Sequence, residues 1–386
     1  MISVNDRTTD LFEGLWPISR EGVSYNSYLI DDEKKVLIDL TKDFKTDTLV
    51  DQISGVFNPA ELDYFILNHM EPDHTGAIKT LMRIAPKATI LCTGKAVPLL
   101  EAYYGITDRI QEVADGETLS VGDRTLQFFH APFVHWPETM VTYDTKDKIL
   151  FSCDAFGGYG ALRGYNFDDE CSDLDYYKSE SLRYYSNIVA KFSKPVLNAI
   201  KKLGGVDIDV IAPSHGLVWR AHPEDIIDLY SKWAGYATGD TELGISLLYG
   251  SMYGNTEEVM NAIAKGISSA GVPVEIFDVA RTHTSYILPS VWSKKGVIIG
   301  APTYEGSLFP AMQSTLEELR VKRVSNKKAA IFGSYGWSGG AEKTIRGIIE
   351  PLKWEVTDTF IFQGGPTEND LNKALEFGRN FAKSLD

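Results

Sequence analysis

Cysteine is scarce in this chain of 386 residues, which has only Cys92, Cys153 and Cys171. Their number is odd, they are widely spaced, and no two form a C-x-x-C pair. The sequence therefore predicts neither a disulfide framework nor an iron module held by cysteines. We expect a protein of a reducing compartment, the cytoplasm.

Targeting and membrane signals are also missing. The first residues, MISVNDRTTDLFEG, contain no basic and no apolar stretch of the kind that forms a secretory signal. No apolar run approaches the ~18 residues of a membrane span. The formal net charge of -15 disfavours nucleic acid and anionic membranes as partners. With 44% apolar residues and no repeats, the chain reads as a globular protein of two domains.

The chain changes character near residue 242, after the polar stretch Thr238–Glu242. Residues 1–242 read as short strands joined by turns, with a β-hairpin of Asn26–Ile30 and Lys35–Asp39. Further strands are expected at Tyr64–Asn68, Leu126–His130, Thr139–Tyr143, Ile149–Cys153 and Val210–Ala212, and helices at Thr75–Ile84, Ser181–Lys201 and Pro223–Tyr236.

Strands and helices alternate in residues 243–386. Strands are expected at Gly244–Tyr249, Val274–Asp278, Val297–Gly300, Ala329–Gly333 and Thr359–Gln363. Helices are expected at Thr256–Ala270, Leu308–Arg320, Ala341–Lys353 and Glu368–Leu385. This order predicts an open, doubly wound parallel sheet with helices on both faces.

A dense group of metal-binding side chains stands in HMEPDH, residues 69–74, after a short apolar strand and before a helix. Imidazoles and carboxylates are ligands of first-row metals. Residues two apart on an extended segment point the same way, so His69, Glu71 and Asp73 can converge. Asp73 and His74 can face a neighbouring metal. Because four ligands exceed what one tetrahedral ion takes from one strand end, the sequence predicts a dinuclear site.

Three more candidate ligands follow elsewhere: His135 in FVHWP, Asp154 at the end of ILFSCD, and His215 in APSHG. Asp154 is the best bridge, because one carboxylate can give an oxygen to each of two metals ~3.5–4 Å apart. Each residue alone also fits a core or turn position, and the ordered combination carries the prediction. The other histidines, His130, His222 and His283, are read as ordinary core or surface residues.

A loop rich in glycine and hydroxyl groups, GSMYGNT at residues 250–256, opens a helix in the second part. Hydroxyls, backbone N–H groups and the helix N-terminus form an anion-binding cup. The loop has neither G-x-G-x-x-G nor the Gly-Lys of a P-loop, so it fits the monophosphate of FMN better than a pyrophosphate. The candidate residues are Ser251, Met252, Tyr253, Gly254, Asn255 and Thr256.

Two later loops fall at the carboxyl ends of the third and fourth strands, where open α/β sheets bind ligands. The first contains Pro302, Thr303, Tyr304, Glu305 and Gly306, and the second contains Ser334, Tyr335, Gly336, Trp337, Ser338 and Gly339. Tyr304 and Trp337 can shield a planar ring, and the small residues let backbone donors approach it. Glycine-rich turns are often only structural, but three at the expected strand ends resemble flavodoxin and predict FMN.

Together these motifs resemble the flavodiiron proteins, which join a metallo-β-lactamase-like domain to a flavodoxin-like domain. Hydrolytic relatives of the first domain carry H-x-H-x-D-H, whereas this chain has Glu71 at the second position. A carboxylate in place of an imidazole makes the site harder and more anionic, which favours iron over zinc. The resemblance implies an N-terminal αββα sandwich in residues 1–242 and a flavodoxin-like five-stranded sheet in residues 243–386.

The resemblance also implies the ligand sets. One iron is held by His69, Glu71 and His135, the other by Asp73, His74 and His215, and Asp154 bridges them. In some relatives the position of His74 does not coordinate. Tyr25 and Trp136 are candidates for the pocket lining, and a core role fits each of them equally well.

The implied reaction is the reduction of dioxygen to water or of nitric oxide to nitrous oxide. FMN takes two electrons and a diiron pair stores two more, and dioxygen needs four to become two waters. The chain ends after its last predicted helix, so we expect a separate electron donor, such as rubredoxin or a reduced deazaflavin coenzyme. The resemblance implies a head-to-tail homodimer or a dimer of dimers.

Two other interpretations share these motifs. A zinc hydrolase with an accessory flavodoxin-like domain keeps the first fold, but Glu71 argues against it. A non-catalytic electron carrier with a structural metal is the second, although structural sites are usually closed and rich in cysteine. Iron content distinguishes the first interpretation, and dioxygen consumption the second.

Overall fold

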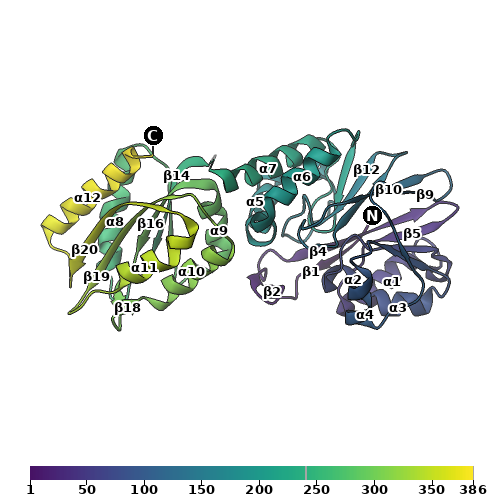
Figure 1. The fold of residues 1–386 in the computed structure, drawn as a ribbon, viewed down its shortest axis with the longest axis horizontal. Coiled ribbons are helices and arrows are strands. Elements are labelled where there is room, and N and C mark those ends of the chain that lie inside the picture. Colours follow the sequence, from purple (N-terminus) through teal and green to yellow (C-terminus); the bar gives the residue numbers. More distant parts are fainter. Residues whose placement is uncertain (240, 386) are drawn as a thin grey trace. The chain divides into compact units, whose positions relative to one another are not determined.

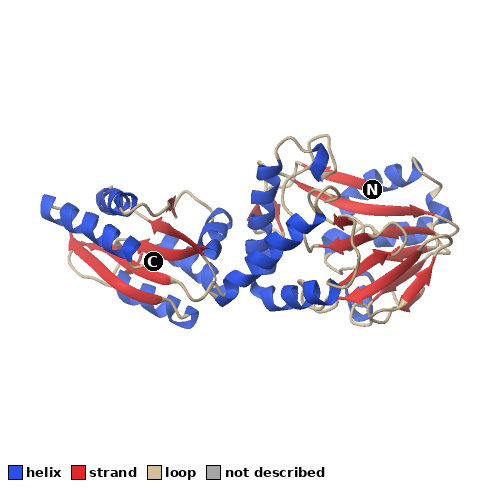
Figure 2. Ribbon diagram, turned by 90° about the horizontal axis from the view of Figure 1, so that it is seen from above, coloured by secondary structure: helices blue, strands red, loops and turns tan. Residues whose placement is uncertain are grey.

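The computed structural model describes residues 1–239 and 241–385, so Asp240 of the predicted boundary segment and Asp386 lie outside the described residues. The chain forms two compact units, Met1–Ala234 and Gly235–Asp386, seen as the two bodies of Figures 1 and 2. The boundary near residue 242, where strand β14 begins, remains a prediction.

The first unit contains two sheets. One is ordered β1 (Ile2–Asp6), β4 (Val23–Asp31), β5 (Lys35–Ile38), β6 (Tyr64–Ile66), β7 (Thr89–Cys92) and β8 (Ile110–Glu112). The other is ordered β13 (Val210–Pro213), β12 (Ile149–Cys153), β11 (Met140–Asp144), β10 (Thr125–His130) and β9 (Thr118–Ser120). Strands β4 and β5 pair antiparallel, which confirms the predicted hairpin. Strands β5 to β8 run parallel, as do β12 and β13.

The two sheets pack face to face around a shared core. Ile38 and Ile66 of the first sheet are buried together with Phe128, Met140 and Phe151 of the second. Side chains alternate between the faces of a strand, so the neighbours of these residues point outward. Burying such aliphatic and aromatic side chains contributes roughly 1.5–3 kcal/mol each, which holds the sandwich together.

Helices cover both outer faces of the sandwich. On the first sheet, Leu37 and Phe65 pack with Leu49 of α1 (Thr46–Ser54), Leu81 of α3 (Ile78–Ile84) and Leu100 of α4 (Val97–Tyr104). On the second sheet, Leu150 of β12 lines one cavity with residues of α6 (Ser193–Leu203) and α7 (Pro223–Gly235). This is the predicted αββα order of layers.

Two predicted helices differ from the structure. The helix expected over Thr75–Ile84 is divided into α2 (Pro72–Thr75) and α3, with Gly76 between them. A Cβ on Gly76 would lie 2.4 Å from the backbone nitrogen of Asp43, so the close approach of another segment bends the chain there. The helix expected over Ser181–Lys201 is α5 (Leu174–Tyr184), a π-helical turn (Tyr185–Val189), a short 3₁₀ turn (Ala190–Phe192) and α6.

The second unit is a five-stranded parallel sheet. Its order is β15 (Val274–Asp278), β14 (Glu242–Tyr249), β16 (Lys294–Gly300), β19 (Lys328–Tyr335) and β20 (Glu355–Gln363). The chain order therefore reverses beside β14, and the carboxyl ends of β14 and β16 flank that switch point. The predicted doubly wound sheet is confirmed.

Both faces of this sheet are covered, as Figure 1 shows. Helices α8 (Asn255–Ser269) and α12 (Glu368–Lys383) pack Ile263 and Phe381 against Leu247, Ile298 and Phe332. The other face is covered by α9 (Thr284–Ser293), α10 (Pro310–Val321) and α11 (Ala341–Ile349). Helix α9 was not predicted from the sequence, because Pro289 lies inside it and proline normally interrupts a helix.

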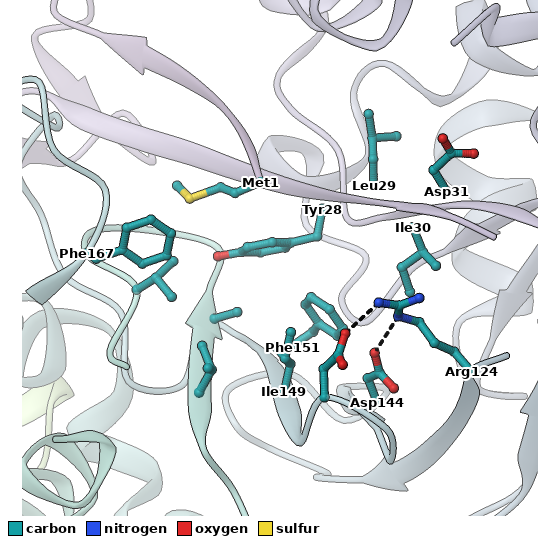
Figure 3. Close-up of a pocket in the computed structure, with 14 residues that line it drawn as sticks. Met1, Tyr28, Leu29, Ile30, Asp31, Arg124, Asp144, Ile149, Phe151 and Phe167 are labelled. Atoms are coloured by element: carbon teal, nitrogen blue, oxygen red, sulfur yellow. Dashed lines mark hydrogen bonds and ion pairs between the residues drawn. The ribbon is translucent and has the colours of Figure 1, made fainter. Parts of the chain in front are cut away.

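A cavity of about 280 Å³ opens between the two sheets of the first unit, as shown in Figure 3. Apolar side chains such as Phe151 form its walls. Arg124 lies at its rim, donating to Asp144 and Asp147 at 3.1 and 2.6 Å. The lining includes Ile149, the first residue of β12, whereas Asp154 follows the last residue of that strand. None of the predicted metal ligands lines this cavity.

No helix in the described part of the chain is both long enough and apolar enough to cross a membrane.

Candidate functional site

The seven candidate ligands lie together at one end of the sandwich. His69, Glu71, Asp73 and His74 follow strand β6, and two more follow the neighbouring strands of the second sheet, Asp154 after β12 and His215 after β13. His135 lies in the loop between β10 and β11. Because β12 and β13 run parallel, their carboxyl ends bring Asp154 and His215 to the same edge.

Glycines let the strand-end loops pack closely. Gly216 has a φ of 80°, a backbone that favours glycine, and a Cβ there would lie 3.2 Å from the backbone nitrogen of Gly158. A Cβ on Gly157 would lie 3.1 and 3.2 Å from the carbonyl oxygens of Asp154 and His215. The glycines of CDAFGG and PSHG therefore allow two candidate ligands to approach each other.

The first group of ligands contains His69, Glu71, His135 and Asp154, with one donor atom from each within 4.8 Å of the others. Oε2 of Glu71 lies 3.2 Å from Nε2 of both His69 and His135. Oδ2 of Asp154 lies 3.5 and 3.3 Å from the same two nitrogens. Two imidazoles and two carboxylates thus face one point.

The second group contains Asp73, His74 and His215, again with donor atoms within 4.8 Å of one another. Oδ1 of Asp154 lies 3.1 Å from Nε2 of His74 and 3.3 Å from Nε2 of His215. Asp73 contacts the same nitrogens at 3.5 and 3.4 Å. The two oxygens of the Asp154 carboxylate therefore face the two groups separately, as a bridging ligand requires.

Several donor atoms in these groups are buried without a hydrogen bond among the described residues. They are both carboxyl oxygens of Asp73, Oδ2 of Asp154 and Nε2 of His215. Leaving such an atom without a partner costs about 1–3 kcal/mol, and more when it is charged. A convergent set of unsatisfied nitrogen and oxygen atoms fits metal ions, which would supply the missing interactions.

The opposite ring nitrogens are held by outer partners. Nδ1 of His69 lies 2.7 Å from Oε1 of Glu138, which also accepts the N–H of Met70 at 3.0 Å. Nδ1 of His215 lies 2.8 Å from the carbonyl oxygen of Ser24. Both contacts leave Nε2 free to face the site, and partners of this kind orient metal-bound histidines.

Strand β4 fixes the loop that carries His215. The side-chain amide of Asn26 donates to the carbonyl oxygens of Pro213 and Gly216, both at 2.9 Å. The hydroxyl of Tyr28 donates to Pro213 at 2.7 Å, and Ser24 accepts the N–H of Gly216 at 2.8 Å. Alternate residues of one strand therefore clamp PSHG in place.

Sequence reasoning missed Glu138, Ser24 and Tyr184. Tyr184 is buried beside the π-helical turn, and its hydroxyl donates to Oδ1 of Asp154 at 2.8 Å. Glu138 stands three residues after His135, in HWPET. A carboxylate so close to a candidate ligand could have been predicted as a partner of the metal site. Ser24 contacts the ring of His215 through its backbone carbonyl, which no side-chain motif reveals. Trp136 packs against the His69 ring, with ring centroids 5.1 Å apart.

Charge in the site is balanced by coupled imidazoles and carboxylates. Burial opposes protonation of the histidines, yet neighbouring carboxylates raise the pKa of His69 and His215 to about 10. The same effect raises the pKa of His74 and His135 to about 9. Burial favours a neutral Asp154, but the surrounding imidazoles hold its pKa well below its usual value. The site therefore favours positive charge next to its ionised carboxylates.

The second candidate site lies at the carboxyl end of the parallel sheet. Ser251 accepts the N–H of Gly254 at 3.0 Å, and Gly254 has a φ of 93° just before α8 begins at Asn255. The hydroxyl of Thr256 lies 3.1 Å from that of Ser334 at the end of β19. The loop of residues 250–256 therefore meets the loop that begins at Ser334, with the N-terminus of α8 between them.

The middle loop forms a small hairpin of β17 (Thr303–Tyr304) and β18 (Ser307–Leu308), directly after Pro302. Glu305 and Gly306 turn it with φ values of 47° and 75°. A Cβ on Gly340 would lie 2.0 Å from the carbonyl oxygen of Gly306. The loop of Pro302 to Gly306 therefore also touches the end of the loop that begins at Ser334.

The aromatic residues of these loops face outward. The exposed fractions of Tyr253 and Trp337 are 90% and 89%, and Met252 and Tyr304 are exposed as well. In the loop that begins at Ser334, the carbonyl oxygen of Gly336 accepts the side-chain N–H of Gln363 at 2.8 Å. The other predicted contacts in this loop are Tyr335, Ser338 and Gly339. Exposed aromatic rings beside the anion-binding loop of residues 250–256 fit a planar ligand that would cover them.

The comparisons with known proteins agree with this geometry. Residues 23–216 match the model of the ODP family beta lactamases, and residues 247–378 match that of flavodoxin. The chain is similar to the crystallised flavodiiron protein of Giardia intestinalis, with a TM-score of 0.93 and 29% identity over 99% of this chain and 94% of that one. This chain belongs to the flavodiiron protein family.

Two other members of the flavodiiron family show the same likeness. The anaerobic nitric oxide reductase flavorubredoxin of Shigella dysenteriae is 36% identical over 96% of this chain and 78% of its own length. The rubredoxin oxygen:oxidoreductase of Desulfovibrio gigas has a TM-score of 0.93 and 28% identity, covering 100% of this chain and 96% of its own.

Replacing Glu138 with Gln tests the outer partner of His69. The amide keeps the size of the side chain but removes the charge that supports Nδ1–H, so we expect the affinity for one metal ion to fall about 10–100-fold. Competition with a chelator measures this change. Glu112→Gln, at an exposed position of the same unit, serves as the control and should bind metal as the parent does. Equal affinity in Glu138→Gln would contradict the assigned role.

The raised histidine pKa values predict how the metal-free chain responds to pH. Its folded histidines bind protons more tightly than unfolded ones, so their stabilisation is complete below pH ~6.5 and is lost as pH rises towards 9–10. We expect the free energy of unfolding of the first unit to fall across this window, measured by denaturant titration. Metal-loaded protein should lack the fall, since its imidazoles carry no extra proton. An equal pH profile in both forms would refute this explanation.

Proposed function

We propose that this chain is a flavodiiron oxidoreductase that reduces dioxygen to water, nitric oxide to nitrous oxide, or both. The observation that carries the proposal is the placement of Asp154, whose two carboxyl oxygens face two separate ligand groups. A carboxylate placed in this way fits a site with two metal ions better than a site with a single ion.

The proposed ligands of the first iron are His69, Glu71 and His135, and those of the second are Asp73, His74 and His215, with Asp154 shared. Glu71 supports iron over zinc, because it gives the first group a second carboxylate beside Asp154. His74 is included because its Nε2 faces Asp73 and Asp154, like that of His215.

The protein's own groups prepare the site for this chemistry. Glu138 and the Ser24 carbonyl orient His69 and His215, and Tyr184 donates to Asp154, so the protein's own groups hold these three donors in place. When bound, the diiron pair and FMN supply the redox chemistry, storing up to four electrons between them. Trp136 packs edge to face against the ring of His69.

FMN is proposed to bind at the three loops of the second unit. The Ser251 loop and the start of α8 would hold the phosphate. Tyr304 and Trp337 would cover the ring, and the backbone of the small residues would meet its edge. The proposed contacts are Ser251, Met252, Tyr253, Gly254, Asn255, Thr256, Pro302, Thr303, Tyr304, Glu305, Gly306, Ser334, Tyr335, Gly336, Trp337, Ser338 and Gly339.

The remaining assignments are proposals as well. An external donor such as rubredoxin, which the Desulfovibrio gigas relative has in its name, would reduce FMN. A head-to-tail homodimer, or a dimer of dimers, would set the FMN of one chain against the metal site of another. The three cysteines are all free, which supports a reducing compartment such as the cytoplasm.

The test is metal and flavin analysis followed by turnover. About two irons and one FMN per chain, with consumption of dioxygen or nitric oxide when a reductant supplies electrons, are the expected results. Asp154→Ala should keep the flavin but lose metal and turnover. Two zinc ions in protein prepared anaerobically with iron available, together with no gas consumption, would contradict the proposal and favour hydrolysis.

A further inference from the structure

A buried polar group lies behind the second ligand set. It consists of Asp39, Cys153 and Nδ1 of His74, whose donor atoms are within 4.8 Å of one another. All three residues are buried, with exposed fractions of at most 1%. Asp39 and Cys153 are not among the proposed ligands, and they face the ring of His74 from the side opposite Asp154.

The outer partners of the three comparable histidines differ in chemistry. His69 has the carboxylate of Glu138 at 2.7 Å, and His215 has a carbonyl oxygen at 2.8 Å. His74 has the sulfur of Cys153, at 3.8 Å from Nδ1. Sulfur is a weak acceptor, so the outer support of His74 is weaker than that of His69 or His215.

Asp39 does not take over this task, because its oxygens are engaged elsewhere. Oδ1 accepts the backbone N–H of Asn68 at 2.9 Å. Oδ2 accepts the side-chain amide of Asn68 at 3.1 Å and the hydroxyl of Ser214 at 3.2 Å. The Asp39 carboxylate therefore ties together the segments that carry His69 and His215, and the thiol remains as the partner of His74.

Consecutive residues thus contact opposite nitrogens of one ring. Cys153 lies at Nδ1 of His74, and Oδ1 of Asp154 lies 3.1 Å from Nε2. The chain achieves this at the end of β12, where Cys153 adopts a left-handed backbone with a φ of 55°. Its carbonyl accepts the N–H of Ser214 at 2.8 Å, which fixes the turn.

We infer that Cys153 is a positioning residue, whose sulfur accepts the Nδ1–H of His74 and holds Nε2 of that ring towards the second metal ion. The inference rests on the proposed function. The unsatisfied oxygens of Asp73 and Nε2 of His215 mark the metal side of the ring independently of the cysteine. Because the sulfur contacts His74 and neither His69 nor His215, its removal should affect the second metal ion alone.

Anaerobic titration with Co²⁺ against a competing chelator, followed by the visible absorption of the bound ion, tests the inference. The parent chain should bind two ions in two steps, and His74→Ala identifies the step that depends on that ligand. Cys153→Ala should weaken this same step about tenfold and leave the other unchanged. Cys153→Ser, which keeps a polar acceptor, should lose less.

Cys92→Ala is the matched control, because it removes a thiol that is equally buried at the end of β7. It should leave both steps unchanged, and thermal melts establish that each variant is folded. Cys153→Ala with parent-like affinity at both steps would overturn the inference, as would an equal loss at both. A parent chain that binds fewer than two ions would instead overturn the proposed function.

Discussion

The structure of the first unit depends on one carboxylate shared between two groups of ligands. Asp154 is 1% exposed, and it faces four imidazoles at 3.1 to 3.5 Å. Burying a charged carboxylate is costly unless opposite charge and hydrogen bonds compensate for the lost water. The four surrounding imidazoles provide that charge when they are protonated, and bound metal ions would provide it in their place.

This constraint explains why so much of the surrounding structure is polar and buried. Strand β4 clamps the loop of His215, Glu138 orients His69, and Asp39 joins the segments that carry both histidines. A partly satisfied polar network costs more than an apolar core, so each of these contacts is needed once Asp154 is buried. The neighbouring glycines permit the backbone approaches that the network requires.

The sequence predicted the parts of the fold that follow from local patterns of apolar and polar residues. Strand β12 was predicted at its observed bounds, and the alternation of strands and helices predicted the doubly wound sheet. The break between α2 and α3 was not predictable, because it depends on the approach of Asp43 to Gly76. Motifs likewise identified the candidate ligands, but not contacts between distant residues such as Glu138 with His69 or Cys153 with His74.

The central claim is that Asp154 lies between two metal ions within one chain. Anomalous X-ray scattering at the iron edge, from crystals of iron-loaded protein, tests it most directly. The account predicts two peaks per chain, ~3.5–4 Å apart, one beside His69 and Glu71, the other beside Asp73 and His215, with a carboxyl oxygen of Asp154 on each. A single peak, or two peaks that Asp154 does not join, would contradict it.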